Sequence, residues 1–369
     1  MKILTVANEK GGVGKTLVSV QFAFYCAFKF GLKVALLDLD QQGSASNTVK
    51  VNSNSAIADI SASNFMLEPV ESFSCKIESH IPELVSSSNL VCFPADDALS
   101  DIEKKGDDFH ELVAYYFSEN INSLGAYFDL VVIDTNPNPD VRSNLGLAVA
   151  THLISPLELN KEPIDGIARL IPRLSALAEN NPDMELGKGF LGMLPNKLTS
   201  TNFQCKNAQE LFNSASDLIL KWKQLDIVLD SSKLSFEKAA VAVALDADGN
   251  AIVKETTHYA AIKEHVGIAE AQANGKPIWE MPNQNVAWGE MKRCFFTMLC
   301  QINPEKEDTS TDEQKAVFAK AEKLYGNTAK AIIKNFWMTD VAASLPGMNL
   351  NEIQTLREMR CAAPISIVL

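Results

Sequence analysis

Short, continuous apolar runs recur along the first half of the chain. Lys2–Asn8 and Lys33–Leu39 are two such runs, and a longer apolar-rich stretch, Lys15–Phe30, lies between them and ends at Gly31. Runs of this length predict strands buried on both faces, and the order strand, helix, strand predicts a parallel βαβ unit. Further strands are predicted at Asn89–Phe93, Leu130–Asp134, His152–Pro156 and Phe190–Pro195. Helical stretches separate these strands, so we expect an α/β fold with a doubly wound, mostly parallel sheet.

Two later regions depart from this alternation. Within Ile219–Val266, the turn-like Asp246–Asn250 is flanked by the apolar runs VAVAL and AIV, which predicts a β-hairpin and an insertion. Pro304–Thr311 is polar and reads as a linker, and helices are predicted after it at Asp312–Trp337 and Leu350–Arg360. We therefore expect one α/β domain over residues 1–303, with residues 219–266 inserted, and a helical extension over residues 304–369.

Composition narrows the possible partners. The chain has 369 residues, a formal net charge of −13 and 46% hydrophobic residues. An acidic protein is a poor candidate for tight, constitutive binding to DNA, because phosphate contacts need a basic surface. The seven cysteines are scattered without a CxxC pair, which indicates reduced thiols in a cytosol and no structural zinc site. No apolar run reaches membrane-spanning length, so no integral membrane segment is expected.

A glycine-rich loop with the sequence KGGVGKT carries the strongest chemical signal. It spans Lys10–Thr16, follows the first strand and opens the first helix. Its small residues let backbone N–H groups turn inward around phosphate oxygens, Lys15 adds a positive charge, and the Thr16 hydroxyl can ligate Mg²⁺. The residues predicted to hold the phosphates are Gly11, Gly12, Val13, Gly14, Lys15, Thr16 and Leu17.

Three carboxylates stand at strand ends. Asp38 and Asp40 lie two residues apart at the end of the second strand, and they point to the same side at the sheet edge where open α/β folds bind ligands. Asp134 ends the apolar run Leu130–Asp134, as a Walker B aspartate does. For Asp38 and Asp40, a capping role at the strand end is the alternative interpretation.

The loop resembles the deviant Walker A motif of the ParA/MinD ATPases, in which a second lysine precedes the two glycines. The resemblance implies a P-loop NTPase fold of the SIMIBI type, ATP and Mg²⁺ as cofactors, and Lys10 as the signature lysine that reaches across a nucleotide-sandwich dimer. It also implies that Asp40 orients the attacking water and that Asp134 holds Mg²⁺ through water. Asp38 would support Mg²⁺ or the loop.

Several positions depart from the family pattern. Leu17 replaces a second threonine, Gln41 stands where the family often has proline, and Asn136 interrupts the common DTPP or DTPG sequence. The resemblance covers about residues 1–300, and its strong motifs lie in the first 140.

The resemblance also suggests a base site. Phe190–Lys197 resembles a later family strand that ends in an asparagine, so Asn196 would pair with the adenine edge; a turn asparagine is the alternative. Ile268–Ile278 resembles the segment before the base-contacting loop, which would place Pro282 near the adenine.

For function, the resemblance favours an ATP-dependent dimerising ATPase that positions or segregates DNA, stimulated by a ParB-like protein. It would be a bacterial cytoplasmic protein, with the nucleoid as a candidate location. The alternative is a MinD-like ATPase that associates with membranes or positions a protein cargo, but the helical face within Lys315–Trp337 reads better as core. Basic residues that could contact DNA without sequence preference are Arg169, Arg173, Lys188, Lys197, Lys206, Lys221 and Lys223, and acidic residues interleave with them.

Overall fold

The computed structural model describes residues 1–159, 172, 189–228, 246–248, 252–338, 345 and 347–365. The chain divides into two compact units, and each is described by itself. Unit 1 comprises Met1–Leu220 and Ala260–Met291, and unit 2 comprises Lys221–Tyr259 and Lys292–Leu369. The boundary predicted at residue 303 stays a prediction.

Unit 1 is built on a seven-stranded sheet in the order β3-β4-β2-β5-β1-β6-β7, in which every neighbouring pair is parallel. This confirms the predicted α/β fold with a parallel sheet. The strands are β1 (Lys2–Val6), β2 (Val34–Asp38), β3 (Ala56–Ile57), β4 (Leu90–Phe93), β5 (Leu130–Asp134), β6 (His152–Leu157) and β7 (Phe190–Pro195). Six of them occupy the predicted apolar runs, and the edge strand β3 has too few residues to form a recognisable run.

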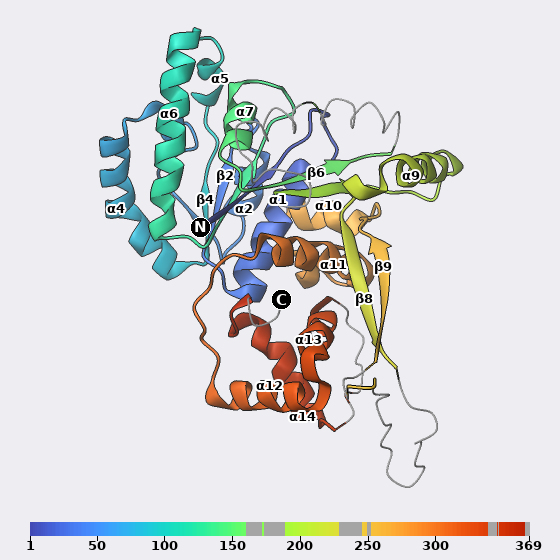
Figure 1. The fold of residues 1–369 in the computed structure, drawn as a ribbon. Coiled ribbons are helices and arrows are strands. Elements are labelled where there is room, and N and C mark those ends of the chain that lie inside the picture. Colours follow the sequence, from blue (N-terminus) through green and yellow to red (C-terminus); the bar gives the residue numbers. More distant parts are fainter. Residues whose placement is uncertain are drawn as a thin grey trace. The chain divides into compact units, whose positions relative to one another are not determined.

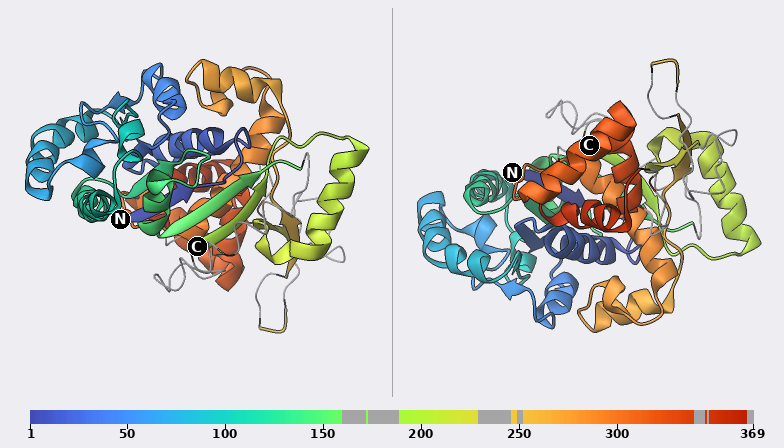
Figure 2. Two further views of the ribbon diagram at one scale, coloured as in Figure 1. Left: turned by 90° about the horizontal axis from the view of Figure 1, so that it is seen from above. Right: turned by 90° about the horizontal axis from the view of Figure 1, so that it is seen from below.

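Helices cover both faces of this sheet. Helix α1 (Lys15–Phe24) packs on one face, against β1, β2, β5 and β6. On the other face, helices α4 (Val70–Ser87) and α6 (Asp107–Ser123) lie side by side (Figure 1; Figure 2). Their buried side chains join alternate residues of the strands in one apolar cluster that includes Phe73 of α4 and Phe117 of α6. Burial of both faces explains why the strands read as continuous apolar runs.

The predicted helix over Lys15–Phe30 is observed with a change of geometry. After α1, the turn Tyr25–Lys29 is a π-helix, and the chain then turns at Gly31, whose φ is 62°. The other helices of unit 1 within the described ranges are α2 (Ser44–Lys50), α3 (Asn64–Leu67), α5 (Leu99–Ile102), α7 (Val141–Ala148), α9 (Asn202–Ala215) and α10 (Val266–Ala273). Short 3-10 turns cover Leu124–Ala126, Ser216–Leu218 and Ile278–Glu280.

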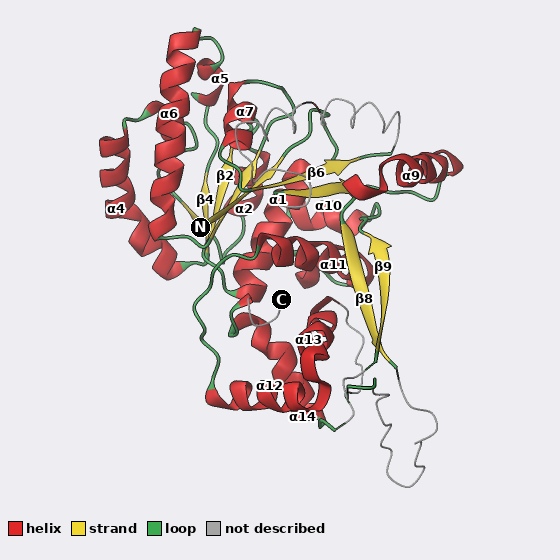
Figure 3. Cartoon of the chain, in the orientation of Figure 1, coloured by secondary structure: helices red, strands yellow, loops and turns green. Residues whose placement is uncertain are grey.

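Unit 2 contains an antiparallel pair of strands, β8 (Lys221–Ile227) and β9 (Val253–Tyr259), drawn in yellow in Figure 3. This pair is not the predicted hairpin, because β8 precedes VAVAL and β9 begins only at the last residue of AIV. VAVAL and the end of the turn Asp246–Asn250 lie outside the described residues. The remaining helices are α11 (Asn285–Ile302), inside which the division between the units falls, α12 (Asp312–Tyr325), α13 (Ala329–Met338) and α14 (Leu350–Glu358).

The predicted helical C-terminal region is present, but one helix is interrupted. The expected helix Asp312–Trp337 breaks at a 3-10 turn that begins with Gly326, whose φ is 56°. Glycine adopts this conformation without a steric penalty, so it separates α12 from α13. Across the described ranges, no helix is both long enough and apolar enough to cross a membrane.

Candidate nucleotide site

The glycine-rich loop connects β1 to α1 and turns through two left-handed positions. Gly12 has a φ of 80° and Gly14 a φ of 95°, and Gly14 is the residue that caps α1. Side chains with a Cβ rarely adopt these angles, which is why the sequence needs glycine there. The loop therefore leads directly into the N-terminus of α1, where the first backbone N–H groups have no partner within the helix. At that position, the N–H donors and the helix dipole both stabilise a bound anion.

Lys15 is held as a buried charge at the base of this loop. The residue is 7% exposed, and Nζ donates a hydrogen bond to the carbonyl oxygen of Lys10 at 3.2 Å. Burial lowers the pKa of Lys15, while the nearby carboxylates of Asp134 and Asp40 act in the opposite direction. A desolvated ammonium group next to a helix N-terminus is suited to bind a polyphosphate.

Asp134 lies behind the loop, at the carboxyl end of β5, and is fully buried. Its two oxygens accept hydrogen bonds from the hydroxyls of Thr16, at 2.8 Å, and Ser19, at 2.9 Å. Burial, followed by the neighbouring charge of Asp38, raises the pKa of Asp134 to about 8. A buried carboxylate beside a threonine hydroxyl is the oxygen donor set that suits a hard cation, so these residues fit Mg²⁺.

Asp38 is the neighbour of Asp134 across the sheet, since the two residues are paired in the register of β2 and β5. One oxygen of Asp38 accepts from the N–H and the hydroxyl of Ser46, at 2.8 and 2.6 Å, and the other accepts from the N–H of Asp40 at 3.2 Å. Burial raises its pKa to about 6. These contacts tie the loop after β2 to the start of α2.

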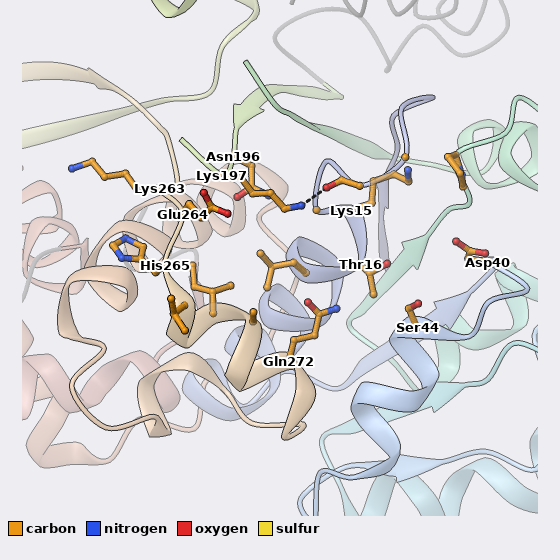
Figure 4. Close-up of a pocket in the computed structure, with 18 residues that line it drawn as sticks. Lys15, Thr16, Asp40, Ser44, Asn196, Lys197, Lys263, Glu264, His265 and Gln272 are labelled. Carbon is orange, nitrogen blue, oxygen red and sulfur yellow. Dashed lines mark hydrogen bonds between the residues drawn. The ribbon is translucent and has the colours of Figure 1, made fainter. Parts of the chain in front are cut away.

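A cavity of about 810 Å³ opens in front of the loop (Figure 4). Lys15, Thr16 and Asp40 lie toward one end of the view, and Lys263–His265 lie toward the other. The volume falls within the roughly 300–1,000 Å³ of small-molecule sites. The cavity is therefore large enough for a nucleotide whose phosphates lie at the glycine-rich loop.

Two residues after β7 reach back to the loop from between these ends. The Asn196 amide nitrogen donates to the carbonyl oxygen of Val13 at 2.9 Å, while its buried amide oxygen has no hydrogen-bond partner among the described residues. Lys197 donates to the carbonyl oxygen of Gly12 and forms an ion pair with Glu158 at 3.0 Å. The phosphate loop is thus held from outside by residues about 180 positions away in sequence.

Comparison with known proteins agrees with this geometry. The family model described as an AAA domain matches residues 1–186. The protein IncC from Escherichia coli is 32% identical over 209 residues, which are 55% of this chain and 52% of IncC. The chromosome partitioning protein ParA from Myxococcus xanthus is 22% identical over 197 residues, which are 53% of this chain and 66% of that protein. The chain belongs to the ParA/MinD family of P-loop ATPases.

The match to IncC spans about half of that relative's length. Among solved structures, McdA from Cyanothece in complex with ATP has a TM-score of 0.55 and 15% identity, and the alignment covers 83% of this chain and 98% of McdA. At this identity, the likeness shows a shared fold and nothing more.

Five of the predicted site residues do not line the cavity. Lys10 and Pro282 are exposed, whereas Val13, Asp38 and Asp134 are buried behind its wall. The cavity wall is instead completed by residues that sequence reasoning missed: Ser44, Lys263, Glu264, His265 and Gln272. The resemblance of Ile268–Ile278 to the segment before the base loop pointed to this neighbourhood, but no motif marks Lys263–His265.

Each of the predicted basic residues that the structure describes has a local partner. Arg169, Arg173 and Lys188 lie outside the described residues. Lys206 lies 3.9 Å from Glu210 and Lys223 lies 2.7 Å from Glu255. Lys221 stacks over the ring of Tyr259 at 5.7 Å, and Lys197 is bonded to the phosphate loop. Within the described ranges, the candidate lysines are engaged locally.

Proposed function

We propose that this chain hydrolyses ATP to ADP and phosphate in a Mg²⁺-dependent reaction. The observation that carries the proposal is a single cavity that joins the glycine-rich loop and buried Lys15 to Asp40. The cavity combines the ammonium group of Lys15, backbone N–H donors and a carboxylate. This combination suits phosphoryl transfer, in which the protein positions groups and stabilises charge.

Each residue has a defined part in this proposal. Lys15 binds the β- and γ-phosphates, and the N–H groups of Gly12–Thr16 cradle their oxygens. Asp40, which is half-buried at the cavity wall, orients the attacking water. The hydroxyl of Thr16 and the carboxylate of Asp134 would hold Mg²⁺, which neutralises charge on the phosphates when bound, and Asp38 supports this pair.

We further propose that ATP binding joins two chains, with Lys10 of each reaching the phosphates of the other. The exposure of Lys10 and its absence from the wall of its own cavity support a role in trans. A charge supplied by the partner makes hydrolysis depend on dimerisation.

The cargo in this proposal is DNA, with a ParB-like protein that stimulates hydrolysis, in a bacterial cytoplasm. The support comes from the relatives. Apart from IncC, several of them bear the names of chromosome or plasmid partition proteins. The net charge of −13 and the locally paired lysines predict weak, salt-sensitive DNA binding.

Three measurements test these steps in order. Phosphate release with ATP and Mg²⁺ tests hydrolysis, with Lys15→Ala as the variant that should lose nucleotide binding. Light scattering after size exclusion tests dimerisation, where Asp40→Ala should bind ATP and remain dimeric. Normal hydrolysis by Asp40→Ala would contradict the role given to that residue.

The cargo is tested separately by gel shift with and without ATP at low and high salt. We expect a shift that needs ATP and disappears at high salt. Sedimentation with anionic vesicles is the parallel arm, and ATP-dependent binding to vesicles but not to DNA would replace the DNA proposal with a membrane-associated function.

A further inference from the structure

A buried arginine connects the two loops that follow β2 and β5. Arg142 lies in the first turn of α7 and is 4% exposed. Its Nη1 donates to the side-chain oxygen of Gln41 at 3.4 Å, and its Nε donates to Asp140 at 3.1 Å, as does its Nη2. Gln41 follows Asp40 directly, and Asp140 ends the loop that begins after Asp134. The guanidinium group therefore bridges the turn that carries Asp40 and the loop that follows Asp134.

Asp140 holds this arginine in place. One of its oxygens caps α7 by accepting from the N–H of Ser143 at 3.0 Å, and the other accepts from Arg142 and from the amide of Asn136. The side chain of Asp140 is only 10% exposed. A buried ion pair with a capping bond has few alternative geometries, because breaking it would leave a buried charge without a partner. The arginine is thus a fixed point to which Gln41 is attached.

Gln41 lies within the turn that carries Asp40. The N–H of Gly43 donates to the carbonyl oxygen of Asp40 at 2.8 Å, so Asp40–Gly43 is a β-turn with Gln41 at its second position. Proline is favoured at that position because its ring fixes φ. Glutamine leaves φ free, and here its exposed side chain bonds to Arg142 instead.

In the loop after β5, a polar side chain also replaces a proline of the family pattern. Asn136 stands where the family pattern has proline, and its amide nitrogen bonds to Asp140. The neighbouring Pro137 lines the nucleotide cavity, as Asp40 does from the first loop. Two separate departures from the family pattern therefore end in one hydrogen-bonded cluster beside the cavity.

We propose that Arg142 is a positioning residue for ATP hydrolysis. Through Gln41, Arg142 ties the turn that carries Asp40 to the loop after Asp134. The inference rests on the ATPase function proposed above. Its effect is on the orientation of Asp40, and the phosphate loop that binds the nucleotide is not part of the tie. Loss of the tie should therefore lower kcat and leave KM for ATP unchanged.

The experiment measures kcat and KM for ATP in the full chain. Gln41→Ala should lower kcat by roughly three- to tenfold, less than the ~100-fold that a full 1 Å misplacement can cost. Gln42→Ala is the matched control, because this neighbouring exposed glutamine contacts the Asp40 carboxylate through its backbone N–H, which alanine retains. Gln41 is exposed, so its variants should fold, and thermal unfolding checks this.

Rescue by proline separates positioning from general damage. Gln41→Pro should lose less kcat than Gln41→Ala, because proline rigidifies the turn without the arginine. Arg142→Met should lower kcat in the natural background and have little effect on kcat in the Gln41→Pro background. Together these results would support the tie.

Two outcomes would overturn the inference while ATP hydrolysis itself stands. One is a kcat for Gln41→Ala equal to that of Gln42→Ala. The other is an equal loss of kcat for Arg142→Met in both backgrounds. A natural chain that binds ATP but releases no phosphate would instead overturn the proposed function, and the tie with it.

Discussion

Gly14→Ala is the sharpest test of the geometry of the phosphate loop. Gly14 has a φ of 95°, and a Cβ added there would lie 2.0 Å from the amide nitrogen of Asn196. That nitrogen is the one that donates to Val13. Alanine would therefore meet two separate obstacles, a strained backbone and a side chain that must move.

The expected cost follows from these two parts. An L-residue in a left-handed conformation costs about 1–2 kcal/mol. Displacement of Asn196 loses its hydrogen bond to Val13, which contributes about 0.5–1.5 kcal/mol. We expect Gly14→Ala to reduce the free energy of unfolding of unit 1 by about 2–3 kcal/mol, and to weaken ATP binding because the loop shifts.

Urea unfolding and calorimetric titration with a non-hydrolysable ATP analogue measure the two effects. Gly11→Ala is the matched control in the same loop, because Gly11 has no atom within 4 Å of an added Cβ and no positive φ. A double variant, Gly14→Ala with Asn196→Ala, removes the clash. It should relieve the steric part of the destabilisation and leave the backbone strain in place.

The result that would refute this reasoning is equal stability for Gly14→Ala and Gly11→Ala. That outcome would mean that the loop does not hold Gly14 in the left-handed region against Asn196.

Three further predictions follow from buried groups and tight glycines. Lys15→Met should abolish ATP binding in a calorimetric titration without lowering the unfolding temperature, because burial already disfavours the Lys15 charge; a clear drop in that temperature would contradict this. In protein free of metal and nucleotide, the raised pKa of Asp134 contributes stability that is fully present below the pKa of the unfolded chain and is lost as the pH rises through about 8. Stability should therefore fall between pH 6 and 8 by at most about 1.4 kcal/mol per pH unit, and an unchanged slope in Asp134→Asn would oppose that assignment. Gly275→Ala should destabilise unit 1 in urea, because its φ is 60° and an added Cβ would lie 2.5 Å from the carbonyl oxygen of Thr48, whereas Gly106→Ala, with open space around it, should not; equal midpoints would count against the contact.

The strands and the phosphate loop were accessible from sequence because each is encoded locally. A strand buried on both faces leaves a continuous apolar run, and the run Leu130–Asp134 coincides with β5. The KGGVGKT loop carries its own requirement for glycine at left-handed positions, observed at Gly12 and Gly14. The edge strand β3, only Ala56–Ile57, has no such local signal because pairing with β4 alone defines it.

The rest of the site depends on contacts between distant segments, which no local pattern specifies. The sequence offers Asn196 as a base-contacting residue or a turn asparagine, which stays a prediction; neither interpretation includes the bond from its amide nitrogen to Val13, 183 residues away. Lys197 was interpreted as a DNA-contacting candidate, and the structure shows it bonded to Gly12 and Glu158. A lysine or asparagine in sequence carries no information on its partner, so such roles emerge only when the sheet places the strand ends together.

Gln41 and Asn136 show how this limit affects the interpretation of family departures. Taken one at a time, each replaces a proline, and each loss reads as a slight loosening of a loop. In the folded chain, Gln41 bonds to Arg142 and Asn136 bonds to Asp140, so both are attached to the same ion pair. Proline restricts a turn through its own ring, whereas a side-chain bond restricts it through a partner. The second arrangement links the two loops through one ion pair, which neither substitution reveals when it is considered alone.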